Sequence, residues 1–153
     1  MIGNSTNMDF IVNEIFPFFK NHPILTLGWV AIAFMIIQMT VKMKLSKVKV
    51  ISNAIAIQMI NNQNAAVVDL RNADNFKKGH IAESINILPI DIKNGSTKSI
   101  DKYKALPVIL VDENDLNTVA LGETLSKQGF NHLFALKDGI AGWNGENLPL
   151  VTK

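Results

Sequence analysis

The longest apolar run of the chain lies near its amino end. No charged residue occurs from Asn21 to Val41, and the 18 residues of Ile24–Val41 are mostly apolar. As a helix, such a run would cover about 27 Å, close to the thickness of the hydrocarbon core of a bilayer. The pattern therefore predicts one transmembrane helix over residues 23–42. A buried helix of a soluble domain is the alternative.

The charges around this run indicate how it would sit in a membrane. Two acids and one lysine precede it, and four lysines follow it: Lys42, Lys44, Lys47 and Lys49. A cleaved signal peptide has the opposite arrangement, and a lysine excess marks the cytoplasmic side. We therefore expect a single-pass protein with residues 1–22 extracytoplasmic or interfacial, residues 43–49 as a lysine-rich joint and residues 50–153 as a cytoplasmic domain. Fourteen lysines against one arginine suggest an AT-rich bacterial genome, hence the bacterial inner membrane.

Short apolar segments alternate with helix-like segments through the rest of the chain. Ala66–Asp69 is apolar without alternation, as in a parallel strand that is covered on both faces. The expected strands are Val48–Ile51, Ala66–Asp69, Ile85–Ile87, Val108–Val111 and His132–Leu136. Strands that alternate with helices predict an α/β fold, in which a parallel sheet carries helices on both faces.

Three helices are expected between these strands. Ser52 would cap one that ends near Asn62, with an inward face of Ile55, Met59 and either Ile60 or Ala56. Asn72 would cap a short helix to Lys78, which Gly79 would end in a left-handed conformation. The longest helix is expected over Leu116–Gln128, with its inward face formed by Leu116, Ala120, Leu121 and Leu125.

Composition removes several function classes. The chain has no cysteine, which excludes disulfides, zinc–thiolate sites and persulfide chemistry of its own. From Val48 to Lys153, eleven Lys/Arg balance eleven Asp/Glu, so the overall charge of +2 comes from the joint. No basic face for nucleic acid is expected. Histidines at metal-ligand spacing are also missing from the sequence, so we expect neither a transition metal nor a cofactor.

Three blocks of the chain resemble one known family. Val67–Pro89 reads VVDLRNADNFKKGHIAESINILP, which matches a D-x-R…F…G-H-I…N-I block, and Leu136–Leu150 reads LKDGIAGWNGENLPL. Between them, Pro107–Val111 has the character of a strand that leads into an active-site loop. The sequence thereby resembles the rhodanese, or single-domain sulfurtransferase, family. This resemblance implies the same α/β fold.

The resemblance also places the site residues. The family carries sulfur as a persulfide on a cysteine directly after that strand, where this chain has Asp112. The remaining loop positions are Glu113, Asn114, Asp115, Leu116, Asn117 and Thr118. Asp115 stands for the loop glycine and Asn117 for the arginine that balances an anionic substrate. Three carboxylates would repel thiosulfate, so the resemblance implies a degenerate loop without catalytic residues.

The acidic loop leaves three interpretations open. Asp112, Glu113 and Asp115 could hold a divalent cation through oxygen ligands, or Asp112 could be a carboxylate nucleophile. We favour a solvated loop at the start of a helix, with Asp115 or Asn114 as the N-cap and carboxylates that complement the helix dipole. Such a loop could also contact a partner.

Five further residues are expected to have structural roles. Asp69 and Arg71 follow a buried strand and can pair to brace the neighbouring loop. His80, between Gly79 and an isoleucine, is expected to be hydrogen-bonded near Asp69 rather than to act as a base. Trp143 is expected to close the bottom of the core.

From about Pro17 to its carboxyl end, the chain resembles the YibN-like group of bacterial inner-membrane proteins. The resemblance rests on an H-P-I-L-x-x-x-W opening at His22–Trp29 and a G-W-x-G-E-N-L-P-L ending at Gly142–Leu150. We therefore expect a membrane-anchored, catalytically inactive rhodanese-like domain that binds a membrane-protein partner from the cytoplasmic side. The alternative is a sulfurtransferase or sulfur carrier that uses a cysteine of its partner.

Overall fold

The computed structural model describes residues 21–114 and 117–152, except for the side chains of residues 42–45. It divides into two compact units, residues 1–45 and 46–153. The first unit contains helix α3 (Pro23–Leu45), which is long and apolar enough over Pro23–Val41 to cross a membrane. The helix thus continues past the predicted span into the predicted joint. The predicted interfacial segment before it falls mainly on residues 1–20, outside the described residues.

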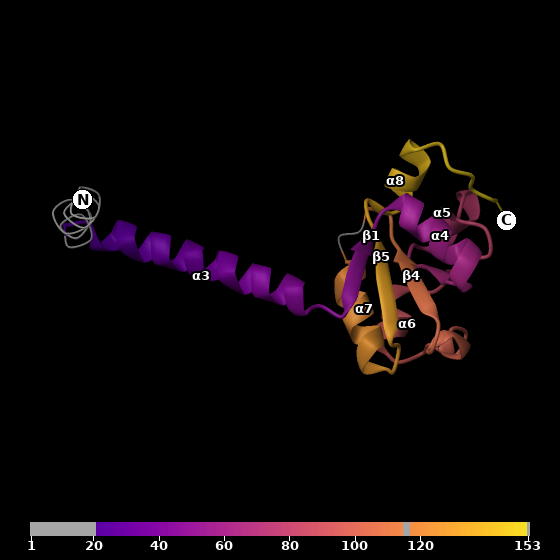
Figure 1. Cartoon of the computed structure of the whole chain (residues 1–153), viewed down its shortest axis with the longest axis horizontal. Helices are drawn as coiled ribbons and strands as arrows, with labels where there is room; N and C mark the ends of the chain where they lie inside the picture. The colour runs from indigo at the N-terminus through magenta and orange to yellow at the C-terminus, as the bar shows by residue number, and fades with distance from the viewer. Residues whose placement is uncertain (1–20, 115–116, 153) are drawn as a thin grey trace, which may run out of the picture. The chain divides into compact units, whose positions relative to one another are not determined.

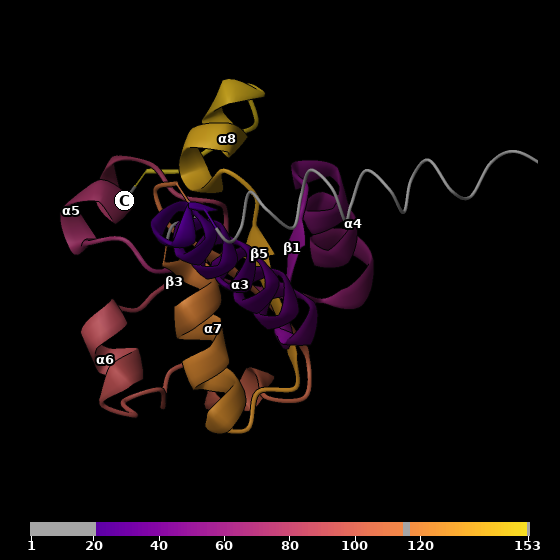
Figure 2. The same ribbon diagram turned by 90° about the vertical axis from the view of Figure 1, so that its left-hand side faces the viewer.

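The second unit is a five-stranded parallel sheet with helices on both faces, as predicted (Figures 1 and 2). Its strands are β1 (Val48–Ile51), β2 (Ala66–Asp69), β3 (Ile85–Asn86), β4 (Pro107–Val111) and β5 (His132–Leu136). Their spatial order is β1-β5-β4-β2-β3, so the first and last strands of the chain are neighbours. All four pairings are parallel, which places every carboxyl end at one edge of the sheet.

The helices that follow the strands are α4 (Asn53–Gln63), α5 (Ala73–Lys78), α6 (Pro89–Lys93), α7 (Thr118–Lys127) and α8 (Gly139–Gly145). A 3-10 turn, η2, spans Asp101–Tyr103. Helices α6 and α7 pack on one face of the sheet, and α4 and α8 on the other (Figure 2). Sequence patterning did not predict α6, η2 or α8, because each is too short to show helical periodicity.

Two hydrophobic clusters form the core, one on each face of the sheet. Val108 and Leu110 of β4 pack into the cluster under α7, whereas Ile109 and Val111 pack into the cluster under α4 and α8. This alternation follows from the two-residue period of a strand. All four side chains are at most 1% exposed. In β2, whose uninterrupted apolar run predicted a doubly covered strand, Val68 and Val67 are divided between the two clusters in the same way.

Several predicted details are wrong. Ile55 is 46% exposed, because the inner face of α4 is formed by Asn53, Ala56 and Met59 instead. Ala120 of α7 is also exposed. Gly79 is extended, with φ 166°, rather than left-handed, since its carbonyl oxygen accepts a hydrogen bond from Arg71 and the chain continues directly into a bridge between His80 and Val151.

The start of α7 also differs from the prediction. The helix begins at Thr118 after an N-cap at Asn117, which forms no side-chain capping bond. Asn114 lies in the bend before it and is not the cap, while Asp115 and Leu116 lie outside the described residues. Ser52 and Asn72 occupy the predicted N-cap positions of α4 and α5, and only Asn72 makes the side-chain bond, from the Asn75 N–H at 2.8 Å.

Candidate functional site

The candidate site lies where β4 ends and the chain turns toward α7. Asp112 follows β4 directly, beside the carboxyl end of β2, since Asp69 and Val111 are register partners. Asp112 is half-buried, whereas Glu113, Asn114 and Asn117 are exposed and Thr118 is buried. Open α/β sheets place their binding crevices at this edge.

The first two residues of the loop are held by helix α8. The backbone N–H of Ile140 donates to the carbonyl oxygen of Asp112 at 2.9 Å, and the N–H of Ala141 donates to that of Glu113 at 3.1 Å. In turn, the Glu113 N–H donates to the Asp112 carboxylate at 2.8 Å. The loop therefore occupies, with its own oxygens, N–H groups at the start of α8 that an anion would otherwise use.

Gly139 permits this close contact between loop and helix. Its φ is +55°, in the left-handed region, and a Cβ placed on it would overlap the carbonyl oxygen of Asp112 and lie 2.8 Å from the carbonyl carbon of Glu113. Any side chain at this position would push the loop away. The sequence did not indicate this contact, because it joins two segments that are distant in the chain.

Arg71 connects β2 to the loop. Its guanidinium donates to both carboxylate oxygens of Asp69, with Nη2 2.8 Å from Oδ2, and Nη2 also donates to the Gly79 carbonyl at 2.7 Å. The side chains of Arg71 and Asp69 are 5% and 1% exposed. The second nitrogen, Nη1, lies 3.6 Å from the exposed carboxylate of Glu113. The predicted pair thus exists, and Glu113 is an additional partner.

The charge of Arg71 is fixed by these neighbours. Burial lowers the pKa of Arg71, but its hydrogen bond to Asp69 and the charges of Asp69 and Glu113 raise that pKa above its usual value. The guanidinium consequently stays protonated at every accessible pH. Asn86 adds a brace by donating from Nδ2 to the carbonyl oxygens of Asp69 and Arg71, at 3.0 and 2.7 Å.

His80 is buried and hydrogen-bonded. Nδ1 lies 2.9 Å from the carbonyl oxygen of Phe76, and the imidazole stacks on the Phe76 ring with centroids 3.9 Å apart. Its backbone pairs with Val151 in both directions. The hydrogen bond therefore joins His80 to α5 rather than to Asp69.

A hollow of about 490 Å³ opens between the loop, α5 and α8. Its charged lining groups are Arg71, Lys78 and Glu113, and the amides of Asn75 and Asn144 face it as well. The sequence did not indicate Lys78, Asn75 or Asn144 as site residues, because α5 and α8 are distant in the chain and line the same hollow only in the folded domain. The hollow offers hydrogen-bond donors beside the apolar side chains of Ile140, Ala141 and Leu150, with one carboxylate in its lining.

Trp143 belongs to the core on the other side of α8. It is 4% exposed, and its indole N–H donates to the carbonyl oxygen of Pro149 at 3.1 Å. Its helix follows β5 immediately and therefore lies at the carboxyl edge of the sheet. Trp143 thus packs into the core cluster near the carboxyl edge of the sheet. Within residues 21–114 and 117–152, no cluster of three or more His, Cys, Asp or Glu side chains is arranged to hold a metal.

Comparison with known proteins assigns the fold to a family. Residues 52–146 match the model of the rhodanese-like domain. The chain belongs to the rhodanese-like domain family. Within it, the chain is 46% identical to the uncharacterized protein YibN of Escherichia coli K12 over 140 residues, which cover 92% of this chain and 98% of YibN.

More distant relatives match a smaller share of the chain. The thiosulfate sulfurtransferase GlpE of Coxiella burnetii is 24% identical over 99 residues, covering 65% of this chain and 90% of GlpE. The crystal structure of a rhodanese-related protein from Thermoplasma volcanium covers 69% of this chain and 99% of its own, at 25% identity and a TM-score of 0.56. This rhodanese-like chain differs from a sulfur-carrying one in having no cysteine at all.

Proposed function

We propose that this protein is a membrane-anchored, catalytically inactive rhodanese-like domain that acts as a protein-interaction module in the cytoplasm. The observation that carries the proposal is the loop after β4. Asp112 stands where a sulfur-carrying member would need its thiol, and the carbonyl oxygens of Asp112 and Glu113 occupy the N–H groups of α8. The fold is present, whereas the groups for persulfide chemistry are not.

The chemistry of the loop supports inactivity. A carboxylate cannot form the persulfide that sulfur transfer requires, and Asp112, Glu113 and Asp115 together repel an anionic sulfur donor such as thiosulfate. Arg71 is a nearby cation, but its charge is already neutralised by Asp69 and faces Glu113. Asn117 adds no positive charge.

Inactivity can be tested with the purified protein. It should transfer no sulfur from thiosulfate to cyanide above background, and its mass should not increase by a persulfide sulfur. Asp112→Cys should also fail, because Glu113 and Asp115 keep the pKa of the new thiol high and repel the anion. Appreciable turnover by Asp112→Cys would show that the loop still binds an anionic donor.

The anchor part of the proposal rests on the first unit. Helix α3 is apolar and long enough over Pro23–Val41 to span a bilayer, and the lysines follow it on the side of the domain. The positive-inside rule then places the domain in the cytoplasm. A reporter enzyme fused after Lys153 should be active only in the cytoplasm, and periplasmic activity would reverse the assigned orientation.

The interaction surface that we propose is the acidic loop beside the hollow. Glu113 is 56% exposed in its side chain, and Asp112 is half-buried next to it. The Glu113 carboxylate at the rim of the hollow, with Asp112 and Asp115 in the same loop, would suit a basic or amphipathic segment of another membrane protein. Confinement to a membrane raises the effective concentration of such a partner, so a weak contact is sufficient.

Crosslinking in native membranes tests this surface. The triple variant Asp112→Asn, Glu113→Gln, Asp115→Asn should lose the partner crosslink without loss of fold or insertion. A matched control removes the same number of negative charges elsewhere, through Glu83→Gln, Asp91→Asn and Glu123→Gln. This control should keep the partner crosslink. A crosslink that survives the loop variant but disappears when Gly28–Ile37 is scrambled would place the contact in α3 instead.

One observation favours the enzymatic alternative. The hollow contains Arg71 and Lys78, and a relative carries the name thiosulfate sulfurtransferase. A sulfurtransferase or carrier of this kind would need a cysteine from its partner. Persulfide on a crosslinked partner, formed only in the presence of this chain, would support that role over a purely binding one.

A further inference from the structure

The amino edge of the sheet presents a row of residues from three neighbouring strands. Val48 is paired with Leu133, and Pro107 with His132, so the starts of β1, β5 and β4 lie level with one another. Lys47, His132 and Leu106 therefore occupy this edge side by side. All three are exposed, and Leu106 is 37% exposed although it is apolar.

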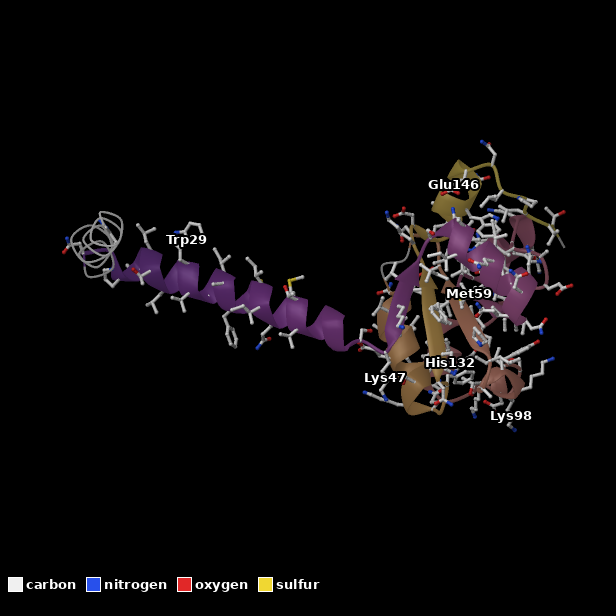
Figure 3. The ribbon with its side chains drawn as sticks, in the orientation of Figure 1. Trp29, Lys47, Met59, Lys98, His132 and Glu146 are labelled. Carbon is white, nitrogen blue, oxygen red and sulfur yellow. The ribbon has the colours of Figure 1, made fainter. Side chains whose placement is uncertain are left out.

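Further lysines gather at the same end of the domain. The Asn131 N–H donates to the carbonyl oxygen of Lys104 at 3.2 Å, which brings the segment around η2 against the start of β5. This segment and the end of α7 carry four lysines: Lys98, Lys102, Lys104 and Lys127. Figure 3 shows Lys47, Lys98 and His132 at one end of the domain and Glu146 at the other.

Two acids accompany these lysines and do not cancel them. The Asp101 carboxylate lies 2.9 Å from the Lys104 ammonium. That hydrogen bond, together with further lysine charge, lowers the pKa of Asp101, so it stays ionised and balances one lysine. Glu83 precedes β3 at the same edge. With Lys47, five lysines face two carboxylates, and we call this surface the basic end.

The opposite end of the sheet has an excess of acids. It carries Asp112 and Glu113 after β4, Asp138 after β5 and Glu146 after α8. Lys137 stands among them, and Lys77 and Lys78 lie on α5. A domain that is neutral as a whole is therefore positive at the amino edge of its sheet and has its acidic loop at the carboxyl edge.

The chain itself ties the basic end to α3. That helix ends at Leu45 and β1 begins at Val48, so Ser46 and Lys47 alone lie between them. From Val41, the last residue of the apolar span, four helical and three extended steps reach no more than about 17 Å. The headgroup layer adds roughly 6 Å to each side of the hydrocarbon core, so the start of β1 cannot leave the neighbourhood of the membrane surface.

We propose that the basic end is a membrane-binding face, which contacts anionic lipid headgroups through Lys47, Lys98, Lys102, Lys104 and Lys127 and inserts Leu106 among them. The inference rests on the proposed membrane anchor but not on inactivity or on a protein partner. Lipid is the occupant because the face is positive, the tether is short and a lysine near an anionic leaflet is attracted to it. The acidic loop then points away from the bilayer.

A fluorescent depth probe can test this orientation. The chain has no cysteine, so Ala105→Cys at the basic end and Glu146→Cys at the opposite end each accept a single environment-sensitive label. The full chain is reconstituted in phosphatidylcholine vesicles with about one-third phosphatidylglycerol, and a lipid with a spin-labelled headgroup serves as the quencher. We expect several-fold stronger quenching at position 105 than at position 146.

The lipid charge and the lysines provide the controls. In pure phosphatidylcholine, or in salt of about 1 M where the Debye length is about 3 Å, quenching at position 105 should fall clearly toward the level at position 146, although the short tether keeps it the higher of the two. The variant Lys98→Gln, Lys102→Gln, Lys127→Gln should have the same effect, since each lysine contributes about a fivefold factor to surface partitioning. The matched variant Lys77→Gln, Lys78→Gln, Lys137→Gln should leave quenching unchanged.

Two outcomes separate this inference from the proposed anchor. If the chain does not stay with the vesicles after alkaline flotation, the membrane anchor is refuted. The other outcome is that the chain floats with the vesicles while both labels are quenched equally, or while quenching at position 105 is the same in anionic and neutral vesicles. Either result would leave the anchor in place and refute the membrane-binding face.

Discussion

A guanidinium in the protein interior needs a carboxylate partner, and Arg71 has Asp69. The sequence indicated this pair, because both residues follow a buried strand two positions apart and so point to the same side. It could not indicate Glu113 as the further partner or Phe76 as the partner of His80, since those contacts depend on how the loop and α5 fold over the strand end.

We predict that Asp69→Asn lowers the free energy of unfolding by about 3–5 kcal/mol, because it leaves a buried guanidinium without its counter-ion. Urea denaturation followed by circular dichroism measures the change. Glu113→Gln removes the other carboxylate near Arg71, yet it should cost less than about 1 kcal/mol, as Glu113 is exposed and 3.6 Å away. Equal effects of the two variants would contradict the assigned importance of Asp69.

Gly139 gives a second prediction about a single residue. Gly139→Ala should destabilise the domain by at least about 2 kcal/mol and displace the loop, since the residue is left-handed and its Cβ would overlap the Asp112 carbonyl. Gly145→Ala, at the end of the same helix with open space around it, should be nearly neutral. Thermal unfolding and amide exchange at Ile140 and Ala141 report stability and loop contact, and an unperturbed Gly139→Ala would refute the close approach.

Among the elements, strands were predictable and helix faces were less so. All four residues of β2 are buried, so an apolar run could be assigned to a doubly covered strand without knowledge of its neighbours. A helix face needs the correct phase, and a shift of one residue rotates it by about 100°. Ile55 was placed inward for its hydrophobicity, whereas the small Ala56 faces the sheet and Ile55 faces out.

The candidate site was predictable in its position and not in its structure. Asp112 could be placed at the end of a strand from the spacing around Pro107. The bonds that fix it come from Ile140 and Ala141, in a helix of seven residues that shows no periodicity. Gly79 illustrates the same limit, since a glycine after a helix usually becomes left-handed and the bond from Arg71 to its carbonyl depends on tertiary contacts.

The buried face of α7 and the exposed face of α4 lead to a prediction about stability. Leu125 is fully buried between α7 and the sheet, so Leu125→Ala should lower the free energy of unfolding by about 2–4 kcal/mol. Ile55→Ala on α4 removes a side chain that is 46% exposed and should cost less than about 1 kcal/mol. Urea unfolding of both variants tests the assigned faces, and the reverse order would mean that α4 is rotated.

For the whole molecule, the division into two units leads to a prediction about truncation. Both core clusters consist of residues from Val48 onward. A fragment that begins at Ser46 should therefore be soluble and should unfold in one cooperative transition, monitored by near-UV and far-UV circular dichroism in urea. A fragment that aggregates or lacks near-UV signal would show that α3 contributes to the core.

The pairing of the first strand with the last has a consequence for biosynthesis. β1 joins the sheet through β5 alone, and 80 residues separate Ile51 from His132. At a synthesis rate of about 5–20 residues per second, β1 waits about 4–16 s for its partner. During that interval α3 is already available to the membrane while β1 remains unpaired. The nascent chain is therefore at its most aggregation-prone immediately beside the bilayer, and arrest of translation between β1 and β5 should leave it sensitive to protease.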